Sequence, residues 1–326
     1  MGMSALEGVG HARETDPLGV ARPVELKAFA ETCDGWRWLH LGRASLEARD
    51  WLRSRSRLSE NVVSALLETD TRPRLALFDE GALLILRAVN RNPGDRPEDM
   101  ISLRLFIEPA RLITVEGRRI GAIEDRVRAL DRGETPTLGA TLAGLVAALR
   151  EEAEPVLDDL QQAIDALEIE AIRIDRALPV RRRHALNDVR HDAIQLHRHL
   201  APQGKAVEAL ARARPSWLGK REREALRRDG EAFSRIAEDL EAVRSRAQVI
   251  SDESALRVAE ETNRIMATLS VISAIFLPLT FATGLLGVNL AGIPFAEADW
   301  SFDAFALSLI ALALILALIL RRLGLI

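Results

Sequence analysis

Hydrophobic and polar positions are distributed very unevenly along this chain. Residues 265–296 and 304–320 contain no charged side chain, while charged residues are frequent almost everywhere else. At about 1.5 Å per residue, a helix over residues 265–286 reaches roughly 33 Å and one over residues 304–320 roughly 25 Å, against a hydrocarbon core near 30 Å. We therefore predict two C-terminal transmembrane helices, with the buried hairpin of a soluble protein as the less favoured alternative.

The charges around these segments predict how they cross the membrane. The connecting loop, residues 287–303, carries Glu297, Asp299 and Asp303 and no basic residue. Basic residues, among them Arg264 and Arg321, flank the other ends of the two segments. Because basic residues favour the cytoplasmic side, we expect the loop outside, both termini in the cytoplasm and residues 321–326 as a cytoplasmic tail.

Short alternating patterns dominate the first third of the chain. Amphipathic helices are expected at residues 46–53 and 60–68, within a cytoplasmic α/β domain over residues 24–132. Residues 1–23 are polar and contain glycine, so we expect a disordered tail there. Strands are expected at residues 35–41, 82–90, 101–107 and 111–116.

Longer helical patterns follow. Residues 133–215 are expected to form a cytoplasmic helical hairpin region, with corners at Pro179, Pro202 and Pro215. From residue 216 the helical pattern continues to residue 286, which predicts a stalk helix that becomes the first transmembrane helix. The expected fold class is an α+β cytoplasmic domain followed by this stalk helix and two transmembrane helices.

Composition narrows the function classes. The 326 residues carry 44 basic and 48 acidic side chains, and no basic block stands apart from acidic neighbours, which argues against a nucleic-acid partner. The single cysteine, Cys33, rules out an intramolecular disulfide. Common catalytic and nucleotide-binding motifs are absent from the sequence, so we expect neither an enzyme nor a prosthetic group.

One face of the first transmembrane helix differs from the others. Steps of alternately three and four residues meet mostly small or polar side chains there, while the opposite face is apolar. Hydroxyl groups that cannot face lipid cheaply must face protein or water. The residues of this face, called the stripe below, are Asn263, Met266, Ser270, Ser273, Leu277, Thr280, Gly284 and Gly287, and the same steps run back through Ala259 and Leu256 to Asp252.

The outer end of the stripe has the composition of a cation entrance. Asn289 follows Gly287 where the chain must leave the helix, and the three carboxylates of the loop come next. A ring of such ends would present amide and carboxylate oxygens, which suit cations. One chain supplies one stripe, so a pore requires an oligomer. Two alternatives remain open: ordinary packing of small residues, and a membrane-anchored coiled-coil sensor or scaffold without ion flux.

A second group of potential ligands lies on one predicted helix of the cytoplasmic part. Such a face would suit a soft divalent ion, although an ordinary solvated face has the same composition. The residues are His184, Asp188, His191, Asp192, Gln195 and His199.

Three motifs around the stripe resemble the CorA superfamily of metal-ion transporters. The family has Gly-Met-Asn where this chain has Gly-Val-Asn, and Val288 with the following residues is more similar to the zinc-transport, ZntB-like, branch. Ala291 departs mildly from that branch, in which glycine is more frequent. The motifs are Asn263-x-x-Met266-x-x-Leu269, Phe276-Leu277-Pro278-Leu279-Thr280-Phe281-x-x-Gly284 and Gly287-Val288-Asn289.

The resemblance implies an assembly and an ion. It implies a homopentamer in a bacterial inner membrane, with a cytoplasmic funnel and a pore lined by the first transmembrane helix. Zinc is the implied ion, while a stripe without His or Cys leaves magnesium, cobalt and nickel open. Uptake driven by the membrane potential, with proton coupling, is a further expectation.

The resemblance also implies roles for single residues. Asn289 would hold a hydrated cation at the entrance, and Thr280 would line the channel below it. A cytoplasmic constriction would be formed by Asn263, Met266 and Leu269. Asp252 matches an acidic pore position farther along the stalk.

Overall fold

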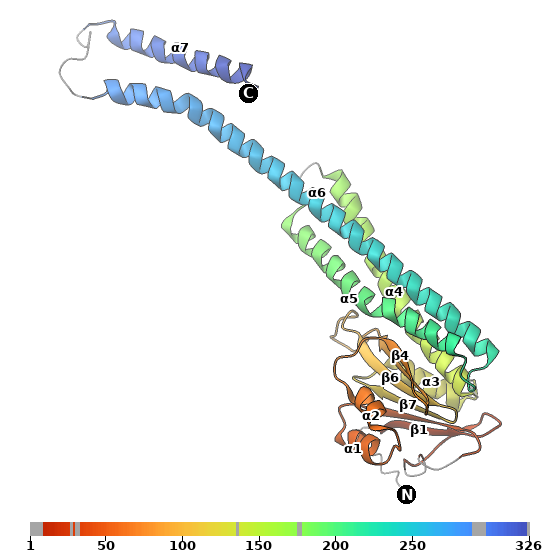
Figure 1. The fold of residues 1–326 in the computed structure, drawn as a ribbon. Helices are drawn as coiled ribbons and strands as arrows, with labels where there is room; N and C mark the ends of the chain where they lie inside the picture. Colours follow the sequence, from red (N-terminus) through yellow and green to blue (C-terminus); the bar gives the residue numbers. More distant parts are fainter. Residues whose placement is uncertain are drawn as a thin grey trace. The chain divides into compact units, whose positions relative to one another are not determined.

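The chain divides into two compact units, which we describe one at a time. The computed structural model describes residues 9–26, 29, 33–134, 137–174, 178–288 and 298–324. The first unit comprises Met1–Arg173 and Pro179–Ile250, and the second comprises Ile174–Leu178 and Ser251–Ile326. One helix of 67 residues, α6 (Lys220–Leu286), contributes to both units (Figure 1).

A seven-stranded sheet forms the middle layer of the first unit. The strand order is β2-β1-β3-β7-β6-β5-β4; β3 and β7 are parallel, and every other described pair is antiparallel. Because β5 and β7 both run antiparallel to β6, the carboxyl ends of β3, β5 and β7 lie at the same edge of the sheet. The strands are β1 (Val9–Thr15), β2 (Ala21–Pro23), β3 (Trp36–Gly42), β4 (Arg74–Leu77), β5 (Ala82–Ala88), β6 (Ile101–Glu108) and β7 (Arg111–Glu116).

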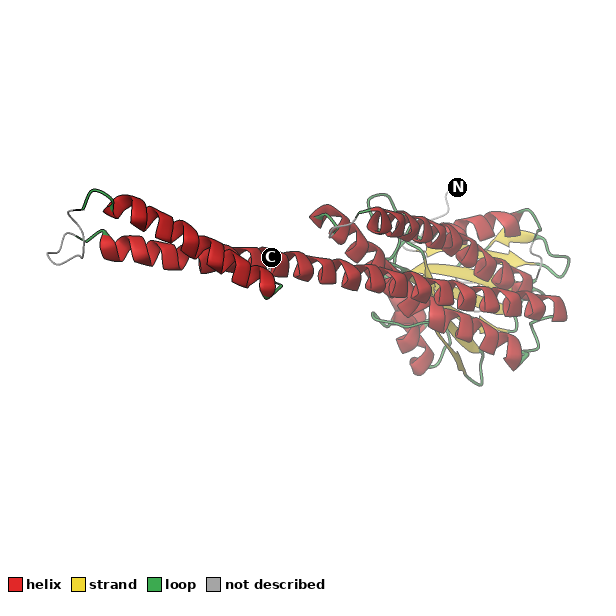
Figure 2. Ribbon diagram, turned by 90° about the horizontal axis from the view of Figure 1, so that it is seen from above, coloured by secondary structure: helices red, strands yellow, loops and turns green. Residues whose placement is uncertain are grey.

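Helices cover both faces of this sheet (Figure 1, Figure 2). Two short helices, α1 and α2, lie on one face, while α4 and α5 contact β5 on the other and α3 packs beside α4. The central strands are therefore apolar on both faces, and every residue of β6 from Ile101 to Ile107 is buried. The helices are α1 (Leu46–Ser54), α2 (Glu60–Leu67), α3 (Gly121–Asp131), α4 (Leu138–Arg173) and α5 (Val180–Ala213).

The main apolar core lies between the sheet and the pair α1–α2. Each central strand contributes alternate residues to it, such as Leu83 and Ile85 of β5, because successive side chains of a strand point to opposite faces. Trp51 of α1 packs edge-on against Phe29, with ring centroids 5.9 Å apart. Fully burying such side chains contributes about 1.5–3 kcal/mol each to stability. This core fixes α1 and α2 on the sheet.

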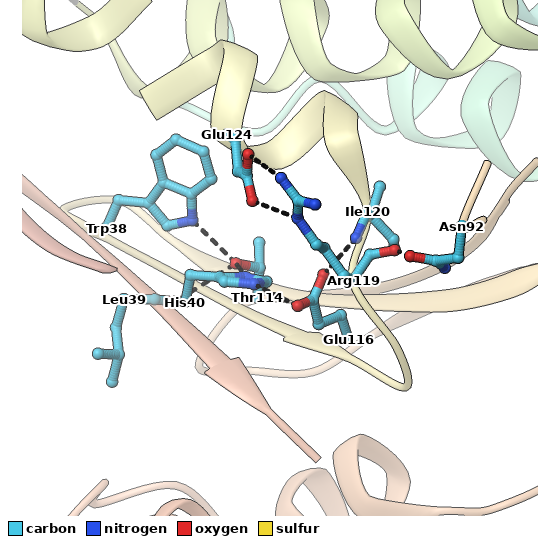
Figure 3. Close-up of polar contacts among 9 residues, drawn as sticks. All are labelled: Trp38, Leu39, His40, Asn92, Thr114, Glu116, Arg119, Ile120 and Glu124. Carbon is cyan, nitrogen blue, oxygen red and sulfur yellow. Dashed lines mark hydrogen bonds and ion pairs between the residues drawn. The ribbon is translucent and has the colours of Figure 1, made fainter. Parts of the chain in front are cut away.

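A buried polar network occupies the opposite face of β3 and β7 (Figure 3). Trp38 Nε1 donates to Thr114 Oγ1 at 2.9 Å, and the same hydroxyl lies 2.8 Å from His40 Nδ1. His40 Nε2 lies 3.4 Å from Glu116 Oε1, and Glu116 Oε2 accepts from Ile120 N at 2.9 Å, just before α3. Because these buried groups are all paired, they hold the start of α3 against the end of β7.

The first strands correct one prediction: residues 9–23 are not a disordered tail. β1 pairs with β3 along the sheet, and β2 pairs with β1. The segment is polar because it is ordered by specific bonds at a sheet edge: Glu14 accepts from Arg37 at 2.8 Å, and Asp16 Oδ1 accepts from Leu18 N and Val20 N, each at 2.9 Å. Residues 1–8 lie outside the described part of the chain.

The four predicted strands are confirmed as β3, β5, β6 and β7, and both short helices are confirmed as α1 and α2. β4 and α3 were not predicted. β4 has only four residues and none of them is buried, so its pattern is weak. The sequence of α3 does carry helical spacing in Ile123, Val127 and Leu130, all buried. That spacing was the signal for the missed helix.

Pro202 does not form a corner, in contrast to the prediction. It lies inside α5, which runs on to Ala213. A proline removes one helical hydrogen bond, and tertiary contacts offset the loss here. Gln203, fully buried, accepts from Arg87 N at 2.6 Å and donates to Arg87 O at 3.2 Å, so α5 is bonded to β5 directly beside the proline.

The second unit contains the charge-free part of α6 and the helix α7 (Ser301–Arg322). Its first turns are tied to the segment before α5: Ser254 Oγ accepts from Leu178 N at 3.3 Å, and Arg257 donates to Ile174 O at 2.6 Å. The prediction of a stalk helix continuing into the first transmembrane helix is confirmed by α6. α7 is longer than the predicted 304–320, because Ser301–Asp303 and both final arginines are also helical.

Candidate ion pathway

Both C-terminal helices are long and apolar enough to cross a membrane. Each of them contains a strongly apolar stretch, and the described part of the chain buries none of either stretch. A buried hairpin of a soluble protein would hide these residues, so that alternative is wrong. Large side chains such as Phe276 and Leu277, each more than 60% exposed, need lipid or further copies of the chain to cover them.

The stripe lies almost wholly on α6. Its positions from Asp252 to Gly284 are helical, Gly287 and Val288 come directly after the helix, and Asn289 lies outside the described residues. Gly287 N still donates to Thr283 O at 2.9 Å, so helical bonding persists to that residue. The structure therefore brings the predicted pore residues from Asp252 to Gly284 onto one helix, while the entrance itself is not described.

The hydroxyl groups of α6 differ by face. Away from the stripe, Thr262 Oγ1 donates to Val258 O and Thr268 Oγ1 donates to Arg264 O, each at 2.9 Å, and Thr283 Oγ1 donates to Thr280 O at 3.0 Å. Bonding to its own helix satisfies a hydroxyl in an apolar environment. The stripe hydroxyls of Ser270, Ser273 and Thr280 make no such bond within the described chain. They remain available to water or to an ion.

Pro278 adds a backbone acceptor at the same depth, a contribution that the sequence analysis missed. A helical residue normally donates to the carbonyl four positions earlier, and proline has no N–H to donate. The carbonyl of Ala274, next to Ser273 of the stripe, thus loses its helical partner. Freed carbonyls at membrane depth are tolerated where they face protein or water. A proline within a charge-free helix was the signal available in the sequence.

The acidic loop is described only in part. Asp299 and Asp303 are exposed, and Asp303 lies in the first turn of α7, where the helix dipole favours a negative charge. Glu297 lies outside the described residues. The large aromatic side chains of Trp300 and Phe302 are exposed beside these acids, which suits the boundary between headgroups and hydrocarbon.

The predicted ligand face of α5 has little metal-binding geometry. His184, Asp188 and His191 are exposed, whereas Asp192 pairs with Arg96 at 2.9 Å. Burial is the main cause that raises the pKa of Asp192, and the negative charge of the nearby Glu98 is the second. In the part of the chain that the structure describes, no three His, Cys, Asp or Glu side chains are close enough to hold an ion. Metal binding at this face stays a prediction.

His199 is half-buried, unlike the exposed His184, Asp188 and His191 of that face. Burial and the nearby cations, first Arg87 and then Arg198, lower its pKa to about 4. Its ring is therefore neutral at physiological pH. Its Nδ1 is buried and has no partner among the described residues.

Known proteins resemble this chain over most of its length. Residues 34–323 match the family described as CorA-like Mg2+ transporter protein. The divalent cation transporter CmaX of Pseudomonas aeruginosa is 37% identical over 267 residues, which is 81% of this chain and 80% of that protein. The zinc transport protein ZntB of Pectobacterium atrosepticum is 31% identical over 309 residues, 94% of this chain and 92% of that protein.

Solved structures share the fold. The structure of full-length CmaX has a TM-score of 0.83 at 33% identity and covers 99% of this chain and 100% of its own. The CorA magnesium transporter from Methanocaldococcus jannaschii has a TM-score of 0.77 at 17% identity, with both chains fully covered. The second likeness concerns the fold alone, and it includes the α/β domain, the long helix and the two C-terminal apolar helices.

Proposed function

Because the chain belongs to the CorA family of transporters, we propose that it moves divalent cations across a membrane through a pore lined by the stripe of α6. The observation that carries the proposal is the difference between hydroxyls on the two sides of that helix. The hydroxyl groups of threonines away from the stripe donate to carbonyls of their own helix. In the described chain the hydroxyl groups of Ser270, Ser273 and Thr280 make no such bond. Oxygen atoms left available along one line are what a hydrated cation requires.

The pore is a property of several chains. One α6 offers one stripe, and its remaining surface is apolar and exposed, so copies must surround the pathway while lipid or α7 covers the other faces. We propose a homopentamer in a bacterial inner membrane with both termini in the cytoplasm, on the strength of the family resemblance and of the basic flanks. Exposed Asp299 and Asp303, with Glu297, would then raise the cation concentration at the outer mouth.

Residue roles follow from position along α6. Asn289, with Gly287 and Val288, would hold the hydrated ion at the entrance. Thr280, Leu277, Ser273 and Ser270 would line the pathway below. Asn263, Met266 and Leu269 would form the constriction on the cytoplasmic side, and Asp252 would lie beyond it.

The driving force needs no nucleotide. A divalent ion entering a cell gains about 4.6 kcal/mol for each 100 mV of inside-negative potential, twice the value for a single charge. Inward movement of cations is therefore favourable through an open pathway. Coupling to protons would add a second gradient.

Zinc is the proposed ion, with magnesium, cobalt or nickel as the second candidate. The names of the relatives divide between zinc and divalent cations in general. The stripe contains no His or Cys, so an ion would cross it with water or oxygen ligands and without tight dehydrated binding. The choice between ions therefore depends on flux measurements.

The test is flux in proteoliposomes containing the purified full-length protein. Zinc and magnesium are offered separately, each with and without a pH gradient. We expect zinc entry that exceeds magnesium entry and increases with an inward proton gradient. Asn289→Ala should abolish the flux, whereas Asn187→Ala, on the exposed surface of α5, should leave it unchanged.

Each alternative predicts a different outcome. Magnesium entry above zinc entry would replace zinc by magnesium as the ion. Zinc flux that ignores the pH gradient would remove proton coupling. Absence of flux with any divalent cation would favour the membrane-anchored scaffold.

A further inference from the structure

Two strands of the sheet, and the residue directly after a third strand, carry an arginine where the core pattern would continue with an apolar residue. Leu83 and Ile85 of β5 point into the core beside α1 and α2, and Arg87 is the next residue on that face. On β6, Arg104 shares the face of Phe106. Arg43, directly after β3, continues the series of Leu39 and Leu41. The three guanidinium groups therefore belong to one face of the sheet.

These arginines meet in a cavity of about 300 Å³ in the first unit. The cavity opens at the edge where β3, β5 and β7 end, the usual place for ligands in sheets with parallel strands. A volume of this size lies at the lower end of small-molecule sites. Polar residues lining it include Arg43, Arg87, Arg104, Arg118, Ser102 and Asp99. We call it the arginine cavity.

The guanidinium groups carry buried donors without partners. In the described chain, Nε of Arg43, Nε of Arg87, and both Nε and Nη1 of Arg104 are buried and donate to no hydrogen-bond acceptor. Arg104 is fully buried. An unpaired buried donor on a charged group is costly, so a native protein normally supplies an acceptor. Four such atoms belong to three arginines that line one cavity, and an acceptor supplied by a ligand would satisfy them.

Carboxylates of the chain do not balance these charges. Within the described residues Arg43, Arg87 and Arg104 form no ion pair, and Arg118 pairs with the exposed Asp95 at 2.7 Å. Among the described residues that line the cavity, Asp99 is the one acidic residue, and it is exposed. Burial, and then the proximity of Arg43 and Arg87, lowers the pKa of Arg104 to about 10, which leaves it charged at neutral pH. Glu68 and Asp70 lie near enough to favour the charged forms of Arg104 and Arg87, but within the described residues neither carboxylate forms an ion pair with them. Positive charge therefore exceeds negative charge at the cavity.

A purely structural role accounts for only part of the arrangement. Arg104 Nη2 donates to Glu68 O at 2.6 Å, just after α2, and Arg87 donates to Met100 O at 2.9 Å and Thr71 O at 2.5 Å. These bonds hold loop carbonyls. They use Nη atoms and leave the remaining donors of the same groups directed toward neither a carbonyl nor a carboxylate.

We propose that the arginine cavity binds the phosphate group of a small anion, either inorganic phosphate or a phosphate ester. Guanidinium groups bind phosphate through paired N–H donors, and several arginines around one anion are typical of phosphate sites. Ser102 Oγ, which lies 2.9 Å from Thr71 Oγ1, adds a hydroxyl to the same wall. The site lies wholly in the first unit and does not depend on the proposed ion pathway.

The experiment is titration calorimetry on purified full-length protein in metal-free buffer, so that an anion cannot bind through a divalent cation. Inorganic phosphate, pyrophosphate and ATP are compared with sodium chloride at equal ionic strength. We expect saturable phosphate binding, and the tightest of the three ligands identifies the source of the phosphate group. Arg43→Gln and Arg104→Gln should each weaken binding by at least about tenfold.

Arg126→Gln is the matched control. Arg126 is also half-buried with an unpartnered Nε, but it lies outside the cavity, so its replacement should leave the affinity unchanged. If the buried Arg104→Gln variant fails to fold, Arg43→Gln alone decides the matter. Wild-type protein that binds phosphate no better than chloride, full affinity in Arg43→Gln, or an equal loss in Arg126→Gln would each overturn the proposal.

Discussion

Single side chains explain most of what distinguishes the stripe from the rest of α6. The hydroxyl groups of Thr268 and Thr283 donate to carbonyls of their own helix, whereas in the described chain those of Ser273 and Thr280 do not. Periodicity alone was enough to predict the stripe, because its residues repeat along one helix. The arginine cavity could not be predicted in this way. Arg43, Arg87 and Arg104 come together only through the pairing order β3-β7-β6-β5, which joins segments far apart in the sequence.

The loop carboxylates should act on the rate of entry at low ionic strength. Replacing Glu297, Asp299 and Asp303 together by Gln, Asn and Asn removes the negative field at the proposed mouth, so the initial flux should fall by roughly three- to tenfold. At about 0.5 M salt the difference should disappear, because exposed charges are screened. Equal flux of the two proteins in low salt would show that the loop does not attract the ion.

His199 makes the stability of the first unit depend on pH. Its pKa is lowered from 6.5 to about 4, so the unfolded chain takes up a proton below about pH 6.5 while the folded chain does not. Stability is full above pH 6.5 and is lost as the pH falls toward 4, by about 1 to 2 kcal/mol once the exposed part of the ring is allowed for.

Thermal unfolding of wild type and His199→Gln between pH 7.5 and 4.5 measures this effect, with the exposed His184→Gln as control. We expect the difference in stability between wild type and His199→Gln to shrink or reverse on acidification. A constant difference across this range would mean that His199 titrates normally.

Whole elements were predicted best where their patterns were strong. The buried strands β3, β5, β6 and β7 have continuous apolar runs, and the long helices have clear amphipathic spacing. β2, at the sheet edge, and its neighbour β1 were missed because ion pairs and turn hydrogen bonds stabilise these polar strands. α5 passes through Pro202 because Gln203 bonds it to the sheet.

Gly35 gives a direct test of the pairing between β1 and β3. A Cβ atom at this position would lie 1.8 Å from Thr15 O, so Gly35→Ala must push β1 away from β3. We expect a loss of about 1–3 kcal/mol in unfolding free energy. Gly121→Ala, where the nearest atom would be 3.9 Å away, should be harmless in the same chemical denaturation experiment. Unchanged stability of Gly35→Ala would contradict the described pairing.

The whole molecule combines a charged α/β unit with two helices, each of which has an apolar stretch that the described part of the chain leaves unburied. The two charge-free segments alone were enough to predict an α/β unit followed by two apolar helices. Full-length solved structures with the same fold confirm that arrangement of elements. The number of copies and the ion were beyond the sequence, because both depend on contacts between chains. The central claim is that the stripe faces water within an assembly of several chains.

The most direct measurement of that claim is block of flux by a membrane-impermeant thiol reagent. In a Cys33→Ala background, Ser273→Cys places a thiol on the stripe and Ile275→Cys places one away from it on the same turn of α6. The account predicts that the reagent stops divalent-cation flux in Ser273→Cys proteoliposomes and leaves Ile275→Cys flux intact. Equal sensitivity of the two variants, or block of Ile275→Cys alone, would contradict it.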